Sequence, residues 1–252
     1  MNRIFYARRM TGKTRIDQLL VIRGFCESRE QAQRAIMAGR VIVGGQKADK
    51  ASLLVSGDAA IEVQSSEKYV GRGGFKLEAA LEHFKVPVKG KTCLDVGSST
   101  GGFTDCLLQR GAAKVYAIDV GRGQIAWKLR NDPRVIVREG INARYLSAAD
   151  IGEKVEICVA DVSFISLTLI LPAVFALLPS AADMIVLIKP QFELSPGKVG
   201  RGGIVRDTSL HVEAIEKIQS FVEGQGKHWL GVIESPLRGR EGNVEFLAHI
   251  TT

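Results

Sequence analysis

The sequence predicts an α/β protein, in which a small α+β unit precedes a larger domain built on a mostly parallel sheet. Three observations support this. In the second part of the chain, seven short apolar stretches alternate with helical patterns. The first of these stretches runs into a glycine-rich turn that opens a helix. The first 68 residues lack this alternation and hold 12 Lys and Arg against 7 Asp and Glu, whereas the rest of the chain is nearly neutral.

The uneven charge indicates the kind of binding partner. A basic front end on a chain of net charge +7 favours a partner rich in phosphate, either nucleic acid or an anionic membrane surface. The four cysteines form no C-x-x-C pair, and the four histidines are scattered, so we expect buried reduced thiols and no metal site. The start "MNRIFYARRM" has no long apolar core, so we expect a cytoplasmic protein.

The small unit shows two helical patterns followed by β-like pieces. "TRIDQLLVIRG" has apolar residues at helical spacing, and "SREQAQRAIMAG" runs from Ser28, a good N-cap, to Gly39. Residues 40–63 contain short strands separated by Gly-Gly and Ser-Gly-Asp turns. We expect a first domain over residues 1–63, a linker over 64–70 and a second domain over 71–252. Arginines that can grip phosphates punctuate the small unit: Arg15, Arg23, Arg29, Arg34 and Arg40.

This unit resembles the RNA-binding domain named after ribosomal protein S4. The matching segments are "RIDQLL", "SREQAQRAI", "GRVIVGG" and "GDAAIEV". The resemblance covers about 50 residues and implies RNA binding.

In the larger domain each apolar stretch predicts one strand. We expect these strands to form a mostly parallel sheet with helices on both faces. We expect helices near 102–110, 124–130, 166–178 and 209–223. The expected strands are Thr92–Val96, Val115–Val120, Val135–Arg138, Val155–Asp161, Met184–Lys189, Trp229–Glu234 and Val244–Ile250.

One apolar run has a second interpretation. Residues 162–182 are 21 uncharged residues, which is long enough to cross a bilayer. Pro172 lies in the middle of the run, and no cluster of Lys or Arg flanks it. We therefore expect a buried strand end and a core helix, and we keep a membrane-active cytolysin as an alternative.

The turn in "CLDVGSSTGGFTDC" suits a nucleoside ligand. Its G-x-x-x-G-G spacing differs from both the dinucleotide fingerprint and the Walker loop. Asp119 ends the next strand, where an acid suits the hydroxyls of a ribose. This combination resembles the S-adenosylmethionine methyltransferases and implies a Rossmann-like sheet. The cofactor-binding residues we expect are Asp95, Gly97, Ser98, Ser99, Thr100, Gly101, Gly102, Phe103, Asp119, Asn142 and Asp161.

Four charged residues lie at predicted strand ends or in the helix before the sheet. Lys76, Asp161, Lys189 and Glu245 resemble the K-D-K-E tetrad of the FtsJ-like RNA 2′-O-methyltransferases. A ribose hydroxyl is a poor nucleophile until its proton leaves, and a lysine can take that proton if its pKa falls towards neutrality. We assign Lys189 as the base, with Lys76 as the neighbouring cation, and the two carboxylates as the groups that orient the lysines and the hydroxyl.

The stretch "GRGGFK" then has a role in catalysis and is not expected to cradle phosphate. Its glycines form a tight entry to the second domain, and Lys76 faces the crevice from the first helix. Arg72 is a further candidate for contact with RNA.

The order "GRGGFKLEAAL", "DVGSSTGGFTDCLLQRGA", "ADVSFISL", "IKPQFE" and "VGRGGIVRD" resembles the TlyA (haemolysin A) family over nearly the whole chain. The resemblance implies 2′-O-methylation of cytidine in 16S or 23S ribosomal RNA, or both, within ribosomal subunits. A non-catalytic RNA-binding factor in ribosome assembly remains a second alternative, although it would not need all four tetrad residues.

Overall fold

The computed structural model describes residues 12–26, 28–63, 68–239 and 241–252, which divide between two units, residues 1–68 and 69–252. Most of the predicted linker, residues 64–67, lies outside the described residues. Tyr69, which the linker prediction included, is 2% exposed and packs with Leu77 and Leu107 in the core of the larger unit. The larger unit therefore begins before residue 71, where the sequence placed it.

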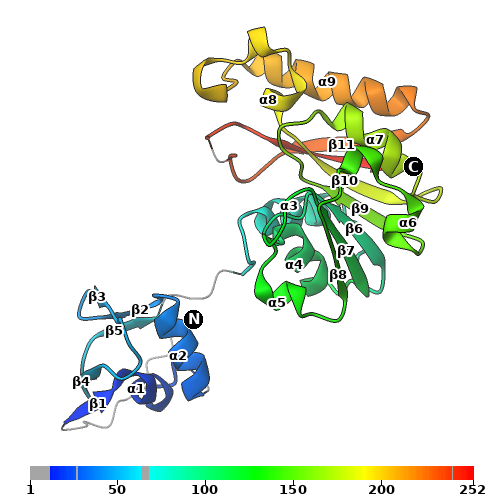
Figure 1. Cartoon of the computed structure of the whole chain (residues 1–252). Helices are drawn as coiled ribbons and strands as arrows, with labels where there is room; N and C mark the ends of the chain where they lie inside the picture. The colour runs from blue at the N-terminus through cyan, green and yellow to red at the C-terminus, as the bar shows by residue number, and fades with distance from the viewer. Residues whose placement is uncertain (1–11, 27, 64–67, 240) are drawn as a thin grey trace. The chain divides into compact units, whose positions relative to one another are not determined.

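The small unit packs two helices against short antiparallel strands (Figure 1). The Ser28 Oγ accepts a hydrogen bond from the Gln31 amide at 3.2 Å, so the second helix begins at the predicted N-cap. The three-stranded sheet has the order β3-β2-β5, and β1 pairs with β4. The elements are β1 (Lys13–Arg15), α1 (Ile16–Ile22), α2 (Arg29–Met37), β2 (Val41–Val43), β3 (Gln46–Lys47), β4 (Leu54–Ser56) and β5 (Ile61–Val63).

The larger unit contains all seven expected strands in one sheet, with the order β11-β12-β10-β9-β6-β7-β8. Every neighbouring pair is parallel except those of β12, which runs antiparallel to both β10 and β11. The strands are β6 (Thr92–Val96), β7 (Lys114–Asp119), β8 (Val135–Glu139), β9 (Ile157–Ala160), β10 (Asp183–Ile188), β11 (His228–Glu234) and β12 (Phe246–Thr251).

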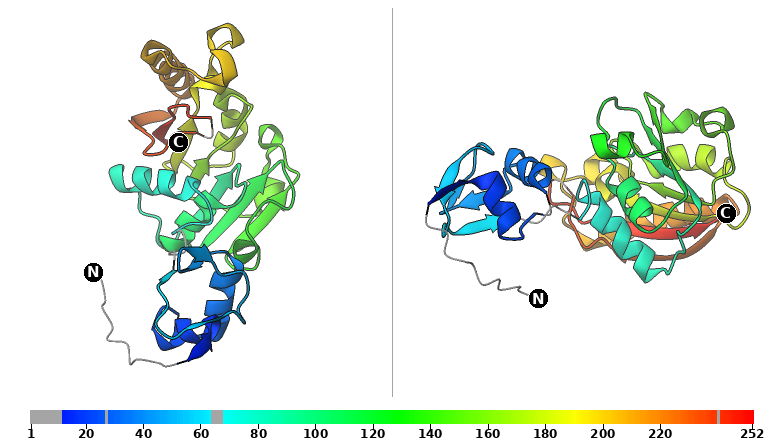
Figure 2. Two further views of the ribbon diagram at one scale, coloured as in Figure 1. Left: turned by 90° about the vertical axis from the view of Figure 1, so that its left-hand side faces the viewer. Right: turned by 90° about the horizontal axis from the view of Figure 1, so that it is seen from below.

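Helices cover both faces of this sheet (Figures 1 and 2). One face packs against α3, α4 and α5, and the other packs against α6, α7 and α9. The helices are α3 (Gly73–His83), α4 (Gly102–Gln109), α5 (Trp127–Arg130), α6 (Ala148–Ile151), α7 (Leu167–Phe175), α8 (Pro190–Glu193) and α9 (Thr208–Gly224), with 3₁₀ turns η1 (Ala143–Tyr145), η2 (Pro196–Lys198) and η3 (Arg201–Gly203).

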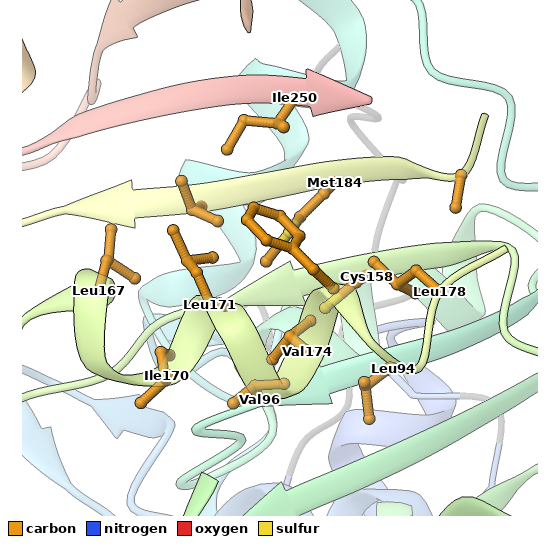
Figure 3. Packing of buried hydrophobic residues seen from close by; sticks show 14 of the residues in the cluster. Leu94, Val96, Cys158, Leu167, Ile170, Leu171, Val174, Leu178, Met184 and Ile250 are labelled. Carbon is orange, nitrogen blue, oxygen red and sulfur yellow. The ribbon is translucent and has the colours of Figure 1, made fainter. Parts of the chain in front are cut away.

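The apolar run at residues 162–182 is part of the hydrophobic core. It contains α7, whose Ile170, Leu171 and Val174 are fully buried against Leu94 and Met184 of the sheet (Figure 3). Within the ranges that the structure describes, no helix is both long enough and apolar enough to cross a membrane. The expectation of a core helix is therefore confirmed for this run.

Helices α3 and α4 approach each other through glycines. A Cβ on Gly102 would lie 3.0 Å from the Gly74 amide nitrogen, and a Cβ on Gly74 would lie 2.2 Å from Cγ of Tyr69. The absence of side chains at these two positions lets the helix backbones meet and closes the core over Tyr69. This contact sets the position of α3, and with it the position of Lys76 two residues further on.

We predict that Gly74→Ala lowers the free energy of unfolding of the larger unit by about 1–3 kcal/mol, because the added methyl overpacks against the Tyr69 ring. Both tryptophans, Trp127 and Trp229, lie in the larger unit, so fluorescence-detected urea unfolding of the full chain reports on it alone. Gly224→Ala is the matched control, because its Cβ would meet nothing within 4 Å. Equal stability of the two variants would contradict the packing argument.

Candidate active site

The loop between β6 and α4 borders a pocket of about 230 Å³ at the carboxyl edge of the sheet. The loop contributes most of the wall, and the rest comes from the start of α3 and from the chain that follows β9 and β10. Backbone amides at the N-terminus of α4 have no partner within the helix, so this end favours a polar or anionic group. The lining residues are Gly73, Gly97, Ser98, Ser99, Thr100, Gly102, Phe103, Asp161, Ser163 and Lys189.

Two glycines of the loop are required by protein packing. A Cβ on Gly97 would lie 2.3 Å from the Asp161 carbonyl oxygen, so the loop can pass this close to the end of β9 only without a side chain. A Cβ on Gly101 would lie 2.2 Å from Leu129 Cδ1, on the side of the core. Gly101 is not among the residues that line the pocket. The need for glycine at this position therefore comes from packing against α5, not from room for a ligand.

Asp119, at the end of β7, holds the loop in shape. Its two carboxylate oxygens accept hydrogen bonds from the amides of Ser99 and Gly121, each at 2.7 Å. Ser99 has a φ of +47°, a left-handed conformation that is uncommon without glycine, and the bond to Asp119 stabilises it. Asp119 is half-buried, so lone pairs remain for the hydroxyls of a ribose.

Asp95 lies beneath the loop and is fully buried. Its Oδ2 accepts a hydrogen bond from Thr104 Oγ1 at 2.6 Å, whereas its Oδ1 has no hydrogen-bond partner among the described residues. Burial is the main cause that raises the pKa of this carboxyl to about 7; the nearby carboxylates of Asp161 and Asp119 act in the same direction, and the Thr104 hydrogen bonds oppose the shift. A buried acceptor without a partner is uncommon in proteins, so this oxygen is available to a donor at the loop.

The four predicted catalytic residues form two ion pairs. Lys189 Nζ lies 2.6 Å from Asp161 Oδ1 and donates a hydrogen bond to Ser163 Oγ at 2.8 Å. Lys76 Nζ donates to Glu245 Oε2, and the two side chains are 10% and 4% exposed. Removing one partner of such a buried pair would leave an uncompensated charge, at a cost of about 3–5 kcal/mol.

Sheet register explains why residues so far apart in sequence share one edge. Ile188 on β10 stands opposite Phe246 on the antiparallel β12. Lys189 is one residue beyond this row and Glu245 one residue before it, so both extend past the same edge. Asp161 follows β9, the other neighbour of β10. The antiparallel direction of β12 therefore brings the start of this strand, and not its end, to the site.

Some predicted site residues lie outside the lining of the pocket. Asn142 accepts a hydrogen bond from the Arg144 amide at 3.0 Å and begins the 3₁₀ turn η1. Asp95 lies below the loop, and Asp119 borders it from β7. The predicted residues outside the pocket lining are Lys76, Asp95, Gly101, Asp119, Asn142 and Glu245.

Three of the arginines proposed for RNA contact hold the small unit together. Arg15 and Arg29 each lie 3.0 Å from Oδ2 of Asp17, which is fully buried, and the Arg15 hydrogen bond holds the pKa of that carboxyl well below its usual range. Arg23 donates to the Ala59 carbonyl oxygen at 2.6 Å. Arg29 keeps about half of its side chain exposed, so it can still reach a phosphate.

The remaining candidates differ in their surroundings. Arg34 is exposed and Arg40 is half-buried. Arg72 belongs to the larger unit and donates to the Arg238 carbonyl oxygen at 3.1 Å, which ties the start of α3 to the loop before β12.

Two residues near the site were not predicted from the sequence. Ser163 binds Lys189 directly, and Phe164 is 90% exposed with a φ of +64°. Phe164 lies beside Phe192, with ring centroids 5.1 Å apart. Both residues fall in the segment "ADVSFIS", and a polar residue followed by an aromatic residue after a strand end was the available signal. An exposed ring beside a pocket suits stacking against a base.

Comparisons with known proteins agree with this geometry. Residues 69–251 match the FtsJ-like methyltransferase family, and residues 14–61 match the S4 domain. The 16S/23S rRNA (cytidine-2′-O)-methyltransferase TlyA of Mycobacterium tuberculosis is 47% identical over 245 residues, covering 96% of this chain and 91% of that protein. Hemolysin A of Brachyspira hyodysenteriae is 43% identical over 93% of this chain and 98% of its own length. A solved Streptococcus thermophilus structure, described as a hemolysin, has a TM-score of 0.73 at 42% identity, covering 96% of this chain and 90% of its own.

The buried carboxyl of Asp95 gives a pH-dependent prediction. Its pKa is about 7 in the folded protein against an ordinary value of 3.8. Between these values the unfolded chain has released the proton and the folded protein still holds it, so this group lowers stability as the pH rises from about 4 to 7. Asp95→Asn removes the effect. We expect the unfolding free energy of the variant, relative to the parent protein, to rise across this window and to level off above pH 7.

Urea unfolding at a series of pH values measures this difference directly. A difference that stayed constant from pH 4 to pH 8 would show that Asp95 ionises in the folded protein as it does in the unfolded chain.

Proposed function

The chain belongs to the FtsJ-like methyltransferase family, in the TlyA group that joins this domain to an S4 domain, and we propose that it transfers the methyl group of S-adenosylmethionine to the 2′-hydroxyl of a cytidine in ribosomal RNA. The substrate would be 16S rRNA, 23S rRNA or both, within ribosomal subunits. The S4 domain supports an RNA substrate, and the activity in the name of the Mycobacterium tuberculosis relative supports the cytidine and the ribose oxygen.

One observation carries the proposal: two lysine–carboxylate pairs, largely buried, lie at one edge of the sheet, and one of them lines the pocket of the glycine loop. Burying charged side chains costs free energy, and a protein that only binds RNA has no need of buried ion pairs beside such a pocket. Methyl transfer to a hydroxyl needs a group that takes the proton and charges that stabilise the developing oxyanion.

The residues at the loop fit S-adenosylmethionine. Asp119 ends the second strand of the parallel unit, where a carboxylate suits the ribose hydroxyls. Asp95 offers a buried oxygen without a partner under the loop. When bound, S-adenosylmethionine supplies the electrophilic methyl group. Asp95, Asp119 and the amides at the start of α4 would hold it.

Lys189 is placed to take the proton of the acceptor hydroxyl. Asp161 and Ser163 hold its Nζ at the pocket wall, so the nitrogen has a fixed position beside the pocket. Once the ammonium group has released a proton to solvent, Nζ accepts the 2′-hydroxyl proton while the oxygen gains its methyl group. For the transfer, the oxygen must lie in line with the methyl group, at roughly 3 Å.

The second ion pair, Lys76–Glu245, holds an ammonium group in a fixed position at the same edge of the sheet. Glu245 holds Lys76, whose ammonium group favours negative charge that develops on the acceptor oxygen. Phe164, with its exposed ring, is placed to stack on a base that has left its helix.

The proposal is tested by methyl transfer from labelled S-adenosylmethionine to purified small and large ribosomal subunits, followed by mapping of the modified nucleotide. We expect label on the ribose of cytidine in one or both subunits. Label on a base would replace the proposed reaction with another methylation. Absence of label in both subunits, with intact cofactor binding by calorimetry, would contradict the proposed function.

A substitution series tests the base. Lys189→Ala should lower the single-turnover rate by at least about 10²-fold, because the acceptor loses its general base. Lys189→Arg should fail to rescue the rate, since a guanidinium does not give up its proton at working pH. Cofactor affinity should change little in both variants. Lys198→Ala is the matched control, because Lys198 forms an exposed ion pair with Glu213 away from the pocket lining. An active Lys189→Arg enzyme would show that Lys189 only positions the substrate.

A further inference from the structure

A second pocket opens beside the catalytic edge, at the end of β11. Its volume is about 520 Å³, more than twice that of the pocket at the glycine loop. It shares none of its lining residues with that pocket. The lining residues are Ile204, Val205, Arg206, Thr208, His211, Glu234, Arg238, Glu241, Gly242 and Val244.

The register of the sheet places this pocket next to the tetrad. Glu234 on β11 and Ile188 on β10 both stand opposite Phe246 of β12, so the three residues form one row across the sheet. Neighbouring strands are about 4.8 Å apart, so the ends of β10 and β11 are separated by roughly 10 Å. Val244 lines the pocket, and the next residue is Glu245 of the catalytic pair. A strand of RNA at Lys189 therefore has its neighbouring nucleotides within reach of this pocket.

The walls of the pocket are held by buried polar contacts. Asn243, which is 1% exposed, accepts a hydrogen bond from the Val205 amide at 2.9 Å and donates to the Gly203 carbonyl oxygen at 2.8 Å. His211 Nε2 lies 2.9 Å from the Val205 carbonyl oxygen. The Gly239 amide donates to the Asn243 carbonyl oxygen at 2.8 Å. These contacts join the segment before α9 to the loop before β12, so the shape of the pocket is preformed.

The charged side chains at the pocket are free to bind. Arg206, Glu234 and Glu241 are exposed and form no ion pair with any described residue. The Arg238 guanidinium donates to the Gly242 carbonyl oxygen at 3.3 Å and keeps its other N–H groups. The pocket thus offers two guanidinium groups and two carboxylates at once. A bare anion would meet repulsion from the carboxylates, whereas a nucleotide presents both an anionic phosphate and neutral hydrogen-bond donors.

We propose that this pocket binds one nucleotide of the acceptor RNA strand that flanks the methylated nucleotide. The proposal rests on the proposed function. Arg206 and Arg238 bind the phosphate, and Glu234 and Glu241 accept hydrogen bonds from an exocyclic amine or a ribose hydroxyl. The volume of the pocket is in the range of ordinary small-ligand sites. The segment "GRGGIVRD", which the catalytic pocket does not use, gains a role as one wall of the substrate site.

The test uses the full-length protein and two separate readouts. RNA affinity is measured by filter binding to a purified ribosomal subunit at several salt concentrations, and the methyl-transfer rate is measured at saturating subunit. Arg206→Ala and Arg238→Ala should each weaken binding by about tenfold, the usual effect of losing a hydrogen bond to a charged group. The double variant should also reduce the slope of log affinity against log salt by about 0.7–0.9, the contribution of one phosphate. The rate at saturating subunit should stay within about threefold of the parent protein, unlike that of Lys189→Ala.

Substitution of the carboxylates distinguishes nucleotide binding from simple charge attraction, because the two predict opposite changes in RNA affinity. Glu234→Gln and Glu241→Gln should weaken binding, because a carboxylate is the stronger acceptor. Tighter binding in both variants would overturn the nucleotide assignment, since the carboxylates would then only repel RNA.

Lys154→Ala is the charge-matched control, because Lys154 is exposed and lies just before β9, at the opposite edge of the sheet. It should change neither affinity nor salt slope. Equal effects of Lys154→Ala, Arg206→Ala and Arg238→Ala would show general charge attraction and overturn the subsite. The binding readout does not depend on methylation, so a parent protein that binds subunits without methylating them would contradict the proposed function alone.

Discussion

Burial of two lysines at the carboxyl edge of the sheet is the constraint on which the rest of the site depends. Each lysine side chain is about 10% exposed, and at that depth an ammonium group requires a carboxylate partner. Each partner comes from a different element, so the two pairs tie α3 to the start of β12 and the end of β10 to the end of β9. The glycine contacts between α3 and α4, the antiparallel direction of β12 and the buried Asn243 all serve to bring these charges together.

Much of this architecture follows from the sequence. The strand expected at Thr92–Val96 has those bounds in the structure, and the others agree to within two residues at every end, because apolar runs bounded by Gly, Asp and Lys mark buried strands. The polar residues at the strand ends were predictable for the same reason. The packing of Gly101 against Leu129 was not predictable, because a sequence cannot distinguish a glycine that leaves room for a cofactor from one that packs against a side chain. Tyr69 was misplaced because the polar stretch "QSSEK" before it hides a buried ring. The contacts of Ser163 and Asn243 depend on residues 26 and 38 positions away, which no local pattern reveals.

In the small unit, one buried acidic side chain holds basic side chains of the surface in fixed positions. Asp17 of α1 is fully buried, and its carboxylate accepts hydrogen bonds from Arg15 at the end of β1 and from Arg29 and Gln33 of α2. The arginines lose rotamer freedom in this cluster before any RNA is present, so less entropy remains to be lost when a phosphate binds. Counting arginines along the sequence does not show which of them have an internal partner, although an acid two residues after Arg15 is a signal for one.

The partners Lys76 and Glu245 are separated by 169 residues along the chain, and β12 lies between β10 and β11 in the sheet. Every strand of the sheet except β12 itself is therefore synthesised before this pair can form. A nascent chain can complete the loop pocket and the pairing of β9 with β10 while half of the charge arrangement is missing. Contacts of such sequence separation are made late in folding, because the closure of a long loop costs entropy first. The pair can therefore form only after the start of β12 has been synthesised, and a chain that stopped before Glu245 would hold a buried lysine without its counter-charge.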